Sequence, residues 1–174
     1  GAFALHRFAP TPPMPAYLLS VAVGRFDAIQ ARAAGVPLRI FTAEGKREQA
    51  RHAMRATRQL LPYFSHYFGV PYALPKLDQL AVPSVRWGAM EDWGLISYAE
   101  DHLLVDPQRS SPATVRDVYG TIAHELAHQW FGNLVTAASW EEIWLNEAFA
   151  TWLERKASDH FNPAWKMPLQ SRLP

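Results

Sequence analysis

The last third of the chain repeats apolar residues at the spacing of two amphipathic helices. In the first, apolar positions recur every three or four residues from Val115 to Trp130. Ser111 followed by Pro112 predicts the N-terminus, because Ser caps free N–H groups and Pro suits the first helical position. Gly132 is a typical residue at which such a helix stops.

A second helical pattern begins at Ser139. Glu142, three residues later, would complete a capping box with it. The apolar positions that follow are Ile143, Leu145, Ala148, Phe149, Trp152 and Leu153. The link of residues 133–138 is short, so we expect the two helices to pack side by side. We expect an aromatic cluster to hold them together: Trp130, Phe131, Trp140, Trp144, Phe149 and Trp152.

Upstream of these helices, the pattern predicts short strands and one long helix. The strands are expected at residues 17–23, 36–41, 80–82, 95–98 and 103–105. A helix over residues 44–68 has one apolar side, and Pro62 inside it should kink or interrupt it. Strands followed by the helical pair predict an α+β domain, with a small mixed β-sheet packed on helices.

Composition narrows the class of protein. The 174 residues are 49% hydrophobic and include seven Trp, which is typical of about one folded domain. A net charge of +1 gives no reason to expect nucleic acid or an anionic membrane as a partner. No segment resembles a transmembrane helix or a signal peptide. The absence of cysteine excludes thiolate ligands and disulfides, and leaves cytoplasmic and periplasmic or extracellular locations open.

Residues 124–128 read His-Glu-Leu-Ala-His and lie within the first predicted helix. Positions four apart share a helix face, so His124 and His128 can bind one metal ion. Glu125 is placed to take a proton from a water that the metal activates. The side-by-side helices return Glu147 toward the two histidines as a third ligand. These three side chains predict one Zn²⁺ per chain.

A second segment carries glycines beside an acid, between two predicted strands. It reads Trp87-Gly88-Ala89-Met90-Glu91-Asp92-Trp93-Gly94. With the helical pair, it resembles the aminopeptidase N-like family of zinc metallopeptidases (gluzincins), which also includes leukotriene-type epoxide hydrolases. That family carries Gly-x-Met-Glu-Asn, then His-Glu-x-x-His, then a Glu after eighteen intervening residues. Residues 11–14, 129–136 and 144–147 also match, and the resemblance extends from Phe3 to about Trp165.

The resemblance implies a thermolysin-like zincin fold and a role for each site residue. His124, His128 and Glu147 would bind zinc, with Glu125 as the general base. Glu91 would bind the free α-ammonium of a peptide.

The same resemblance places the glycine-rich segment along the substrate, with Gly88, Ala89 and Met90 in the substrate-binding part. The chain departs from the family at Asp92, where the family has Asn, and at Ala148, where it has Gly.

The resemblance also implies missing flanking domains. Residues 1–15 would be a linker or the tail of an upstream β-rich domain that supplies a second amine-binding residue. Residues 16–174 would be the catalytic domain, truncated before a C-terminal helical part that carries a catalytic Tyr. We therefore expect the chain by itself to bind zinc but to hydrolyse peptides poorly.

The expected function is that of a zinc-dependent aminopeptidase acting on peptides with a free N-terminus. Two alternatives stay open: an endopeptidase or epoxide hydrolase of the same fold, and an inactive fragment that acts only as a folded module. Glu91 favours the aminopeptidase, since an endopeptidase needs an open cleft. Thr151, one turn beyond Glu147, is a candidate to orient a zinc ligand, although packing or a water-facing position is its more ordinary role. The preferred first residue is not defined by the sequence.

Overall fold

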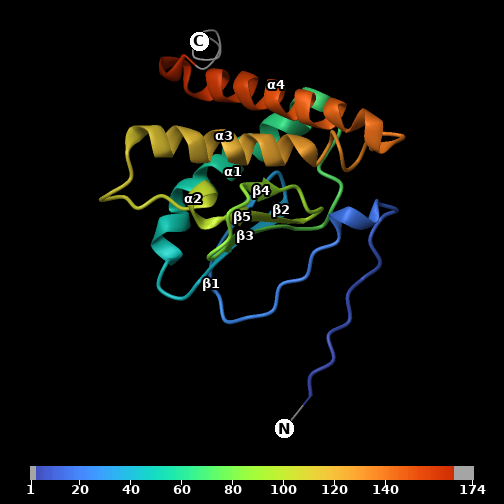
Figure 1. The fold of residues 1–174 in the computed structure, drawn as a ribbon, viewed down its shortest axis with the longest axis horizontal. Helices are drawn as coiled ribbons and strands as arrows, with labels where there is room; N and C mark the ends of the chain where they lie inside the picture. The colour runs from blue at the N-terminus through green and yellow to red at the C-terminus, as the bar shows by residue number, and fades with distance from the viewer. Residues whose placement is uncertain (1–2, 167–174) are drawn as a thin grey trace.

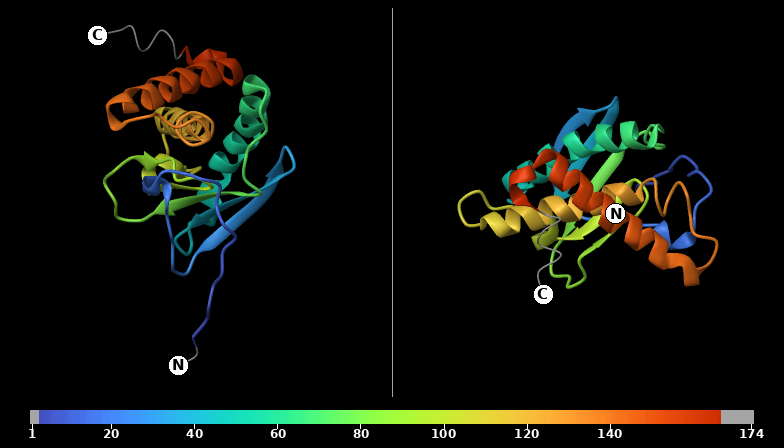
Figure 2. Two further views of the ribbon diagram at one scale, coloured as in Figure 1. Left: turned by 90° about the vertical axis from the view of Figure 1, so that its right-hand side faces the viewer. Right: turned by 90° about the horizontal axis from the view of Figure 1, so that it is seen from above.

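A five-stranded mixed sheet lies under a layer of helices in the computed structural model, which describes residues 3–166 (Figures 1 and 2). The order of the strands is β1-β2-β3-β5-β4. Their bounds are β1 Asp27–Ala33, β2 Val36–Thr42, β3 Leu77–Val82, β4 Ala89–Met90 and β5 Leu95–Ala99. The predicted α+β class with a small mixed sheet is confirmed.

Strands β1 and β2 form a hairpin at one edge of the sheet. Its turn residues, Ala34 and Gly35, both have positive φ angles of 49° and 79°, the combination that a tight two-residue hairpin turn requires. β2 pairs parallel to β3, and β3 pairs parallel to β5. The opposite edge is β4, which pairs antiparallel to β5.

Helix α1, Arg51–Phe68, connects β2 to β3 and follows a 3₁₀ turn at Arg47–Ala50. Its predicted apolar side is buried in the core. Of the two expected effects of Pro62, an interruption does not occur, since the helix runs through it and ends at Gly69 in the left-handed conformation. Gln79 of β3 donates a 2.7 Å hydrogen bond to Thr57, which ties the helix to the central strand.

Helices α3, Pro112–His128, and α4, Ile143–Phe161, pack side by side as predicted (Figures 1 and 2). Ser111 caps α3 by accepting a hydrogen bond from the backbone N–H of Thr114 at 3.1 Å. α3 ends at His128 rather than at Gly132. The intervening residues form turns in which the carbonyl of His128 accepts from the backbone N–H of Asn133.

The predicted capping box of α4 is not formed. A 3₁₀ turn, Trp140–Glu142, precedes the helix, and the backbone N–H of Glu142 donates to the carbonyl of Ser139. The aromatic cluster is also only partly as expected. Phe131 packs on Phe149 at 4.4 Å between ring centroids, and Trp130 is buried. The exposed rings of the cluster are Trp140, Trp144, Phe149 and Trp152.

Two predicted strands are wrong. Residues 17–23 hold only a 3₁₀ turn, Ala16–Leu18, and the apolar side chains after it are mostly exposed. The segment pairs with no strand in residues 3–166, and a strand needs a partner. Leu103 is the last residue of a single helical turn, α2, Glu100–Leu103, which has acids at its start, and residues 104–105 follow it. Val105 instead donates to the carbonyl of Gln49.

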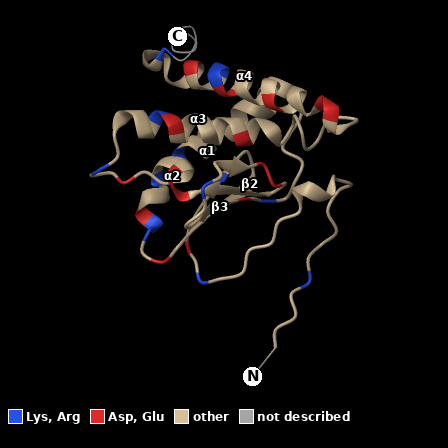
Figure 3. Cartoon of the chain, viewed as in Figure 1, with Lys and Arg blue, Asp and Glu red and all other residues tan. Residues whose placement is uncertain are grey.

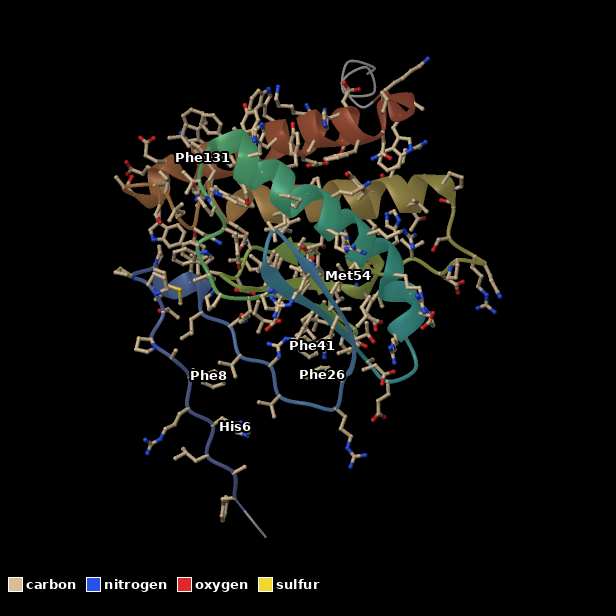
Figure 4. All side chains as sticks on the ribbon, turned by 180° about the vertical axis from the view of Figure 1, so that it is seen from behind. His6, Phe8, Phe26, Phe41, Met54 and Phe131 are labelled. Carbon is tan, nitrogen blue, oxygen red and sulfur yellow. The ribbon has the colours of Figure 1, made fainter. Side chains whose placement is uncertain are left out.

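The chain before residue 16 has no helix or strand in the part described, and Figure 4 shows His6 and Phe8 on this segment away from the body of the molecule. The same view labels Phe26 and Phe41, whose ring centroids are 6.1 Å apart at the edge of the sheet. In residues 3–166, no helix has both the length and the apolar character that crossing a membrane would require.

Candidate metal centre

The three candidate metal ligands converge between α3 and α4. The Nε2 atoms of His124 and His128 are 3.0 Å apart, and Glu147 places its carboxylate oxygens 3.2 Å and 3.7 Å from them. In a tetrahedral zinc site with bonds of about 2.0–2.1 Å, donor atoms lie roughly 3.3 Å from one another. The side chains therefore already have the mutual spacing that a zinc ion would impose.

The hydrogen bonds behind the rings fix which nitrogen faces the centre. Nδ1 of His128 lies 3.0 Å from the carbonyl of Phe131, and Nδ1 of His124 lies 3.3 Å from Glu154. Both partners accept, so each Nδ1 carries a proton, and a ring in its neutral, metal-binding form turns an Nε2 lone pair inward. The two Nε2 lone pairs and the carboxylate of Glu147 then face one another with no hydrogen-bond donor between them. A cation bound there would stabilise the arrangement.

The pKa values of the three candidate ligands also indicate that positive charge is favoured in the site. Burial opposes the charged form of His124, but its bonds to Glu147 and Glu154 and the charge of Glu125 prevail and raise its pKa to about 10. For His128, burial is likewise outweighed by Glu147 and nearby acids, so its pKa is raised. Hydrogen bonds to the two rings lower the pKa of Glu147. In the metal-free protein, protons on the two histidines supply the positive charge that a metal ion would otherwise provide.

Glu125 lies deep in the site, and its Oε2 has no hydrogen-bond partner among the described residues. Burial raises its pKa to about 7, against the charges of the two histidines. A carboxylate whose pKa lies near neutrality can both accept and release a proton at physiological pH. Among the predicted site residues, its environment is the one best suited to proton transfer.

Glu91 lies next to this acid. Atoms of Glu91, Glu125 and His128 lie within 4.8 Å of one another, so this second group shares one histidine with the first. The backbone carbonyl of Glu91 accepts from the side chains of Gln129 at 3.2 Å and Asn133 at 2.9 Å, just after α3. The end of the histidine-bearing helix thus fixes Glu91 at the centre. Figure 3 shows acidic residues along both α3 and α4.

Asp92, the residue that departs from the family pattern, is buried beside Glu91. Its carboxylate accepts a 2.6 Å hydrogen bond from Ser97. Burial raises the pKa of Asp92 to about 6; the Ser97 bond opposes this rise and the charge of Glu91 adds to it. This position therefore changes charge in a pH range where Asn would not.

Ala89 and Met90 form the edge strand β4, opposite Tyr98 and Ser97 of β5. The carbonyl of Gly88 accepts from the backbone N–H of Ala99 at 2.8 Å. No strand within residues 3–166 pairs with the other side of β4. The segment that carries Glu91 is thus held on one side and presents an unpaired edge on the other.

Sequence reasoning missed two residues of this region. Glu154 contacts His124 from two helical turns beyond Glu147, a spacing that places both acids on one face of α4 and could have been used. Thr151 makes no hydrogen bond to a candidate ligand among the described contacts. Tyr17 lies near the site, since the charges of Glu91 and Glu147 act on its phenol. The wrong strand assignment at residues 17–23 concealed it.

Comparison with known proteins gives consistent matches. The model of the "Peptidase family M1 domain" matches residues 52–173. An aminopeptidase N of Acetobacter pasteurianus is 46% identical over 147 residues, which cover 84% of this chain and 41% of that protein. Aminopeptidase M1-A of Oryza sativa subsp. japonica is 46% identical over 161 residues, which cover 92% of this chain and 18% of that protein.

A glutamyl aminopeptidase of Sus scrofa is 43% identical over 161 residues, covering 92% of this chain and 17% of that protein. The chain therefore spans less than half the length of each of these three relatives.

Proposed function

Because this chain belongs to peptidase family M1, we propose that it is the catalytic part of a zinc-dependent aminopeptidase, which releases amino-terminal residues from peptides. One observation carries the proposal: a cluster of acceptors with the spacing of a zinc site lies beside the buried pair Glu91 and Glu125. We further infer a thermolysin-like zincin fold, which the paired helices and the mixed sheet support.

His124, His128 and Glu147 would hold the metal. Two neutral imidazoles and one carboxylate are the usual donor set of a hydrolytic zinc site with one open position. When bound, zinc lowers the pKa of a water molecule and polarises the carbonyl of the scissile peptide bond. Proton transfer and binding of the substrate's ammonium group would be carried out by carboxylates of this chain.

Glu125 would act as general base and then as general acid. Its unpartnered oxygen accepts a proton from the attacking water as the new carbon–oxygen bond forms. The same proton then passes to the leaving nitrogen as the carbon–nitrogen bond breaks. Burial raises the pKa of Glu125 to about 7 in the metal-free protein, which supports a carboxyl group able both to accept and to release this proton.

Glu91 would make the enzyme an exopeptidase. Its carboxylate is held close to Glu125 and His128, so a peptide's free ammonium bound there places the first peptide bond at the metal. An internal peptide bond offers no ammonium at that distance. The unpaired edge of β4 could align the peptide as an added strand along Gly88, Ala89 and Met90.

We also propose that residues 16–174 form this catalytic domain and that residues 1–15 connect it to another. The greater length of the relatives supports further domains around it. Peptides with a free amino terminus would be the substrates.

The proposal is tested by comparing an aminoacyl-anilide with its amino-terminally acetylated form on the zinc-loaded, full-length protein. The free amine should be turned over at least about 100-fold faster, because acetylation removes the charge that Glu91 binds. Glu91→Gln should reduce this preference, whereas Glu141→Gln, at an exposed acid before α4, should not. Equal turnover of both compounds would show that the aminopeptidase assignment is wrong and favour an endopeptidase.

A further inference from the structure

Two buried amide side chains at the end of α3 hold the backbone of Glu91. Nε2 of Gln129 and Nδ2 of Asn133 both donate to its carbonyl, at 3.2 Å and 2.9 Å. A carbonyl oxygen has two lone pairs, so this one is fully used. Each amide side chain is only 2% exposed, and we call the two residues the amide pair. Figure 1 shows β4, which Glu91 follows directly, lying under α3.

The amide pair also contacts the candidate base and a candidate metal ligand. Nε2 of Gln129 donates to the backbone carbonyl of Glu125 at 3.2 Å, so one NH₂ group joins Glu91 to that residue. The backbone N–H of Asn133 donates to the carbonyl of His128 at 3.1 Å. Glu91 is therefore connected to Glu125 through one member of the pair and to His128 through the other.

The position of Glu91 depends on these contacts. The β4–β5 ladder ends one residue earlier, where Met90 lies opposite Ser97. Within residues 3–166, the carboxylate of Glu91 has no hydrogen-bond or ion-pair partner of its own. The carboxylate is thus placed by its backbone, and that backbone is held at its carbonyl by the amide pair.

Holding Glu91 in this way has a cost. Oε1 of Gln129 and Oδ1 of Asn133 are buried and have no partner among the described residues. Rotating either amide would place its oxygen against the carbonyl of Glu91, which also accepts, so the donors stay where they are. Two apolar side chains of similar size could pack a loop on a helix without unpaired acceptors. The amides therefore indicate a need for a defined distance rather than for packing.

The distance between Glu91 and Glu125 determines which peptide bond can react. In a peptide whose ammonium is bound by Glu91, one Cα separates that ammonium from the first carbonyl. The next carbonyl lies about 3.5 Å further along an extended chain. A displacement of Glu91 by a fraction of this length would misplace the first carbonyl, and about 1 Å can cost about 100-fold in rate.

We propose that the amide pair determines exopeptidase specificity. Gln129 and Asn133 are positioning residues, which keep the ammonium-binding carboxylate of Glu91 at a fixed distance from the base and from the metal ligand. They act through Glu91 and not through contact with the substrate. This inference rests on the proposed aminopeptidase function, because that function gives Glu91 an ammonium to bind.

The test removes the bridging amide and compares two substrates. Gln129→Met keeps the length of the side chain without its donor. In the full-length, zinc-loaded protein, kcat/KM for an alanine anilide should fall at least about fivefold, the scale of one lost hydrogen bond. The amino-terminally acetylated anilide should change less than about twofold, because it has no ammonium for Glu91. Elemental analysis should still find about one zinc per chain.

Gln79→Met is the matched control. Gln79 is also buried and would also lose a hydrogen bond, the 2.7 Å bond to Thr57 in the core. The control should leave the ratio of the two rates unchanged. Asn133→Ala, which removes the 2.9 Å bond to Glu91, gives the same comparison if Gln129→Met does not fold.

An equal loss for both anilides, or no loss for either, would overturn the positioning role and leave the aminopeptidase intact. If the parent hydrolyses neither anilide, or both equally, the proposed function fails and calorimetry decides the role of the pair. Alaninamide should then bind the parent more tightly than acetyl-alaninamide, and Gln129→Met should reduce this difference at least about fivefold. Equal affinities in the parent, or an unchanged difference in the variant, would overturn the inference.

Discussion

Glu154 of α4 contacts the ring of His124 at Nδ1, with 3.3 Å between the atoms, while Glu147 faces Nε2 of the same ring at 3.2 Å. One helix thus supplies both the candidate metal ligand and the acid that orients the histidine opposite it. Such outer partners fix the tautomer of a ligating imidazole and increase its basicity.

Replacing Glu154 should weaken zinc binding without removing a ligand. We expect Glu154→Ala to lower zinc affinity about 10–100-fold, the range typical of lost partners behind a metal ligand. Competition with a chromogenic chelator measures this directly. The matched control is Glu142→Ala, at the residue directly before the same helix. An identical loss of zinc affinity in both variants would mean that the negative charge of the helix, and not the contact with His124, determines the affinity.

Variants of the proposed metal ligands and of the proposed general base should differ in how much zinc they retain. His128→Ala and Glu147→Ala should lose bound zinc, whereas Glu125→Gln should retain about one zinc per chain and lose at least about 100-fold in turnover. Elemental analysis after removal of loosely bound metal provides the stoichiometry. Full zinc retention in either ligand variant would show that the ligand set is wrong.

Zinc affinity should increase with pH between 7 and 10. The pKa of His124 is raised from 6.5 to about 10, so the metal-free protein carries a proton that zinc must displace. One displaced proton gives up to about tenfold in affinity per pH unit. Calorimetry at pH 7.5 in two buffers with different ionisation enthalpies should detect the released proton, and buffer-independent heats would contradict the prediction.

The metal-free protein should show the opposite trend in stability. A raised histidine pKa contributes stability that is complete below its ordinary value of 6.5 and is lost as pH rises through about 10. The lowered pKa of Glu147 contributes stability above 4.5 that is lost on acidification. The unfolding temperature of the metal-free protein should therefore fall from pH 6.5 to pH 10. Glu147→Gln should reduce that fall.

Asp92→Asn should stabilise the protein at neutral and higher pH. The folded pKa of about 6 exceeds the ordinary 3.8, so stability present below pH 3.8 is lost as the buried carboxyl ionises through pH 6. Asn still accepts from Ser97 and avoids this loss, worth on the order of 1–2 kcal/mol after screening by solvent.

Thermal unfolding at pH 8 and pH 4 measures the effect. The gain should be present at pH 8 and nearly absent at pH 4, with Asp101→Asn unchanged at both. The rate on peptide substrates should change only modestly, since the amide and the carboxylate occupy similar volumes.

The convergence of His124, His128 and Glu147 could be predicted because helical periodicity determines it. Two histidines four apart share a face, and a short link returns Glu147 to them; both relations are local in the chain. The acid at Glu91 was located only through a family resemblance. Its distance from Glu125 depends on strand order and on the hydrogen bonds from Gln129 and Asn133, which no local pattern specifies.

The strands were harder to predict because pairing decides them. Residues 17–23 are apolar enough for a strand but pair with no strand in the described residues. By contrast, β1 is weakly apolar, and it forms because the Ala34-Gly35 turn brings β2 back alongside it. The 103–105 segment is buried without being extended along a sheet. Tyr17 went unnoticed for the same reason, since it lies in the 3₁₀ turn Ala16–Leu18 and not in the predicted strand.

The closeness of the candidate ligands along the chain has a consequence for how the protein folds. His124 and Glu147 are 23 positions apart, and His128 lies between them. A bound zinc ion would close a short loop, and by the relation used for disulfides this restricts the unfolded chain by roughly 3 kcal/mol. Because the loop is local, the α3–α4 hairpin can assemble around zinc before the sheet is complete. Zinc bound at the proposed ligands should therefore accelerate refolding as well as slow unfolding, and the candidate metal centre would then be part of the folding nucleus.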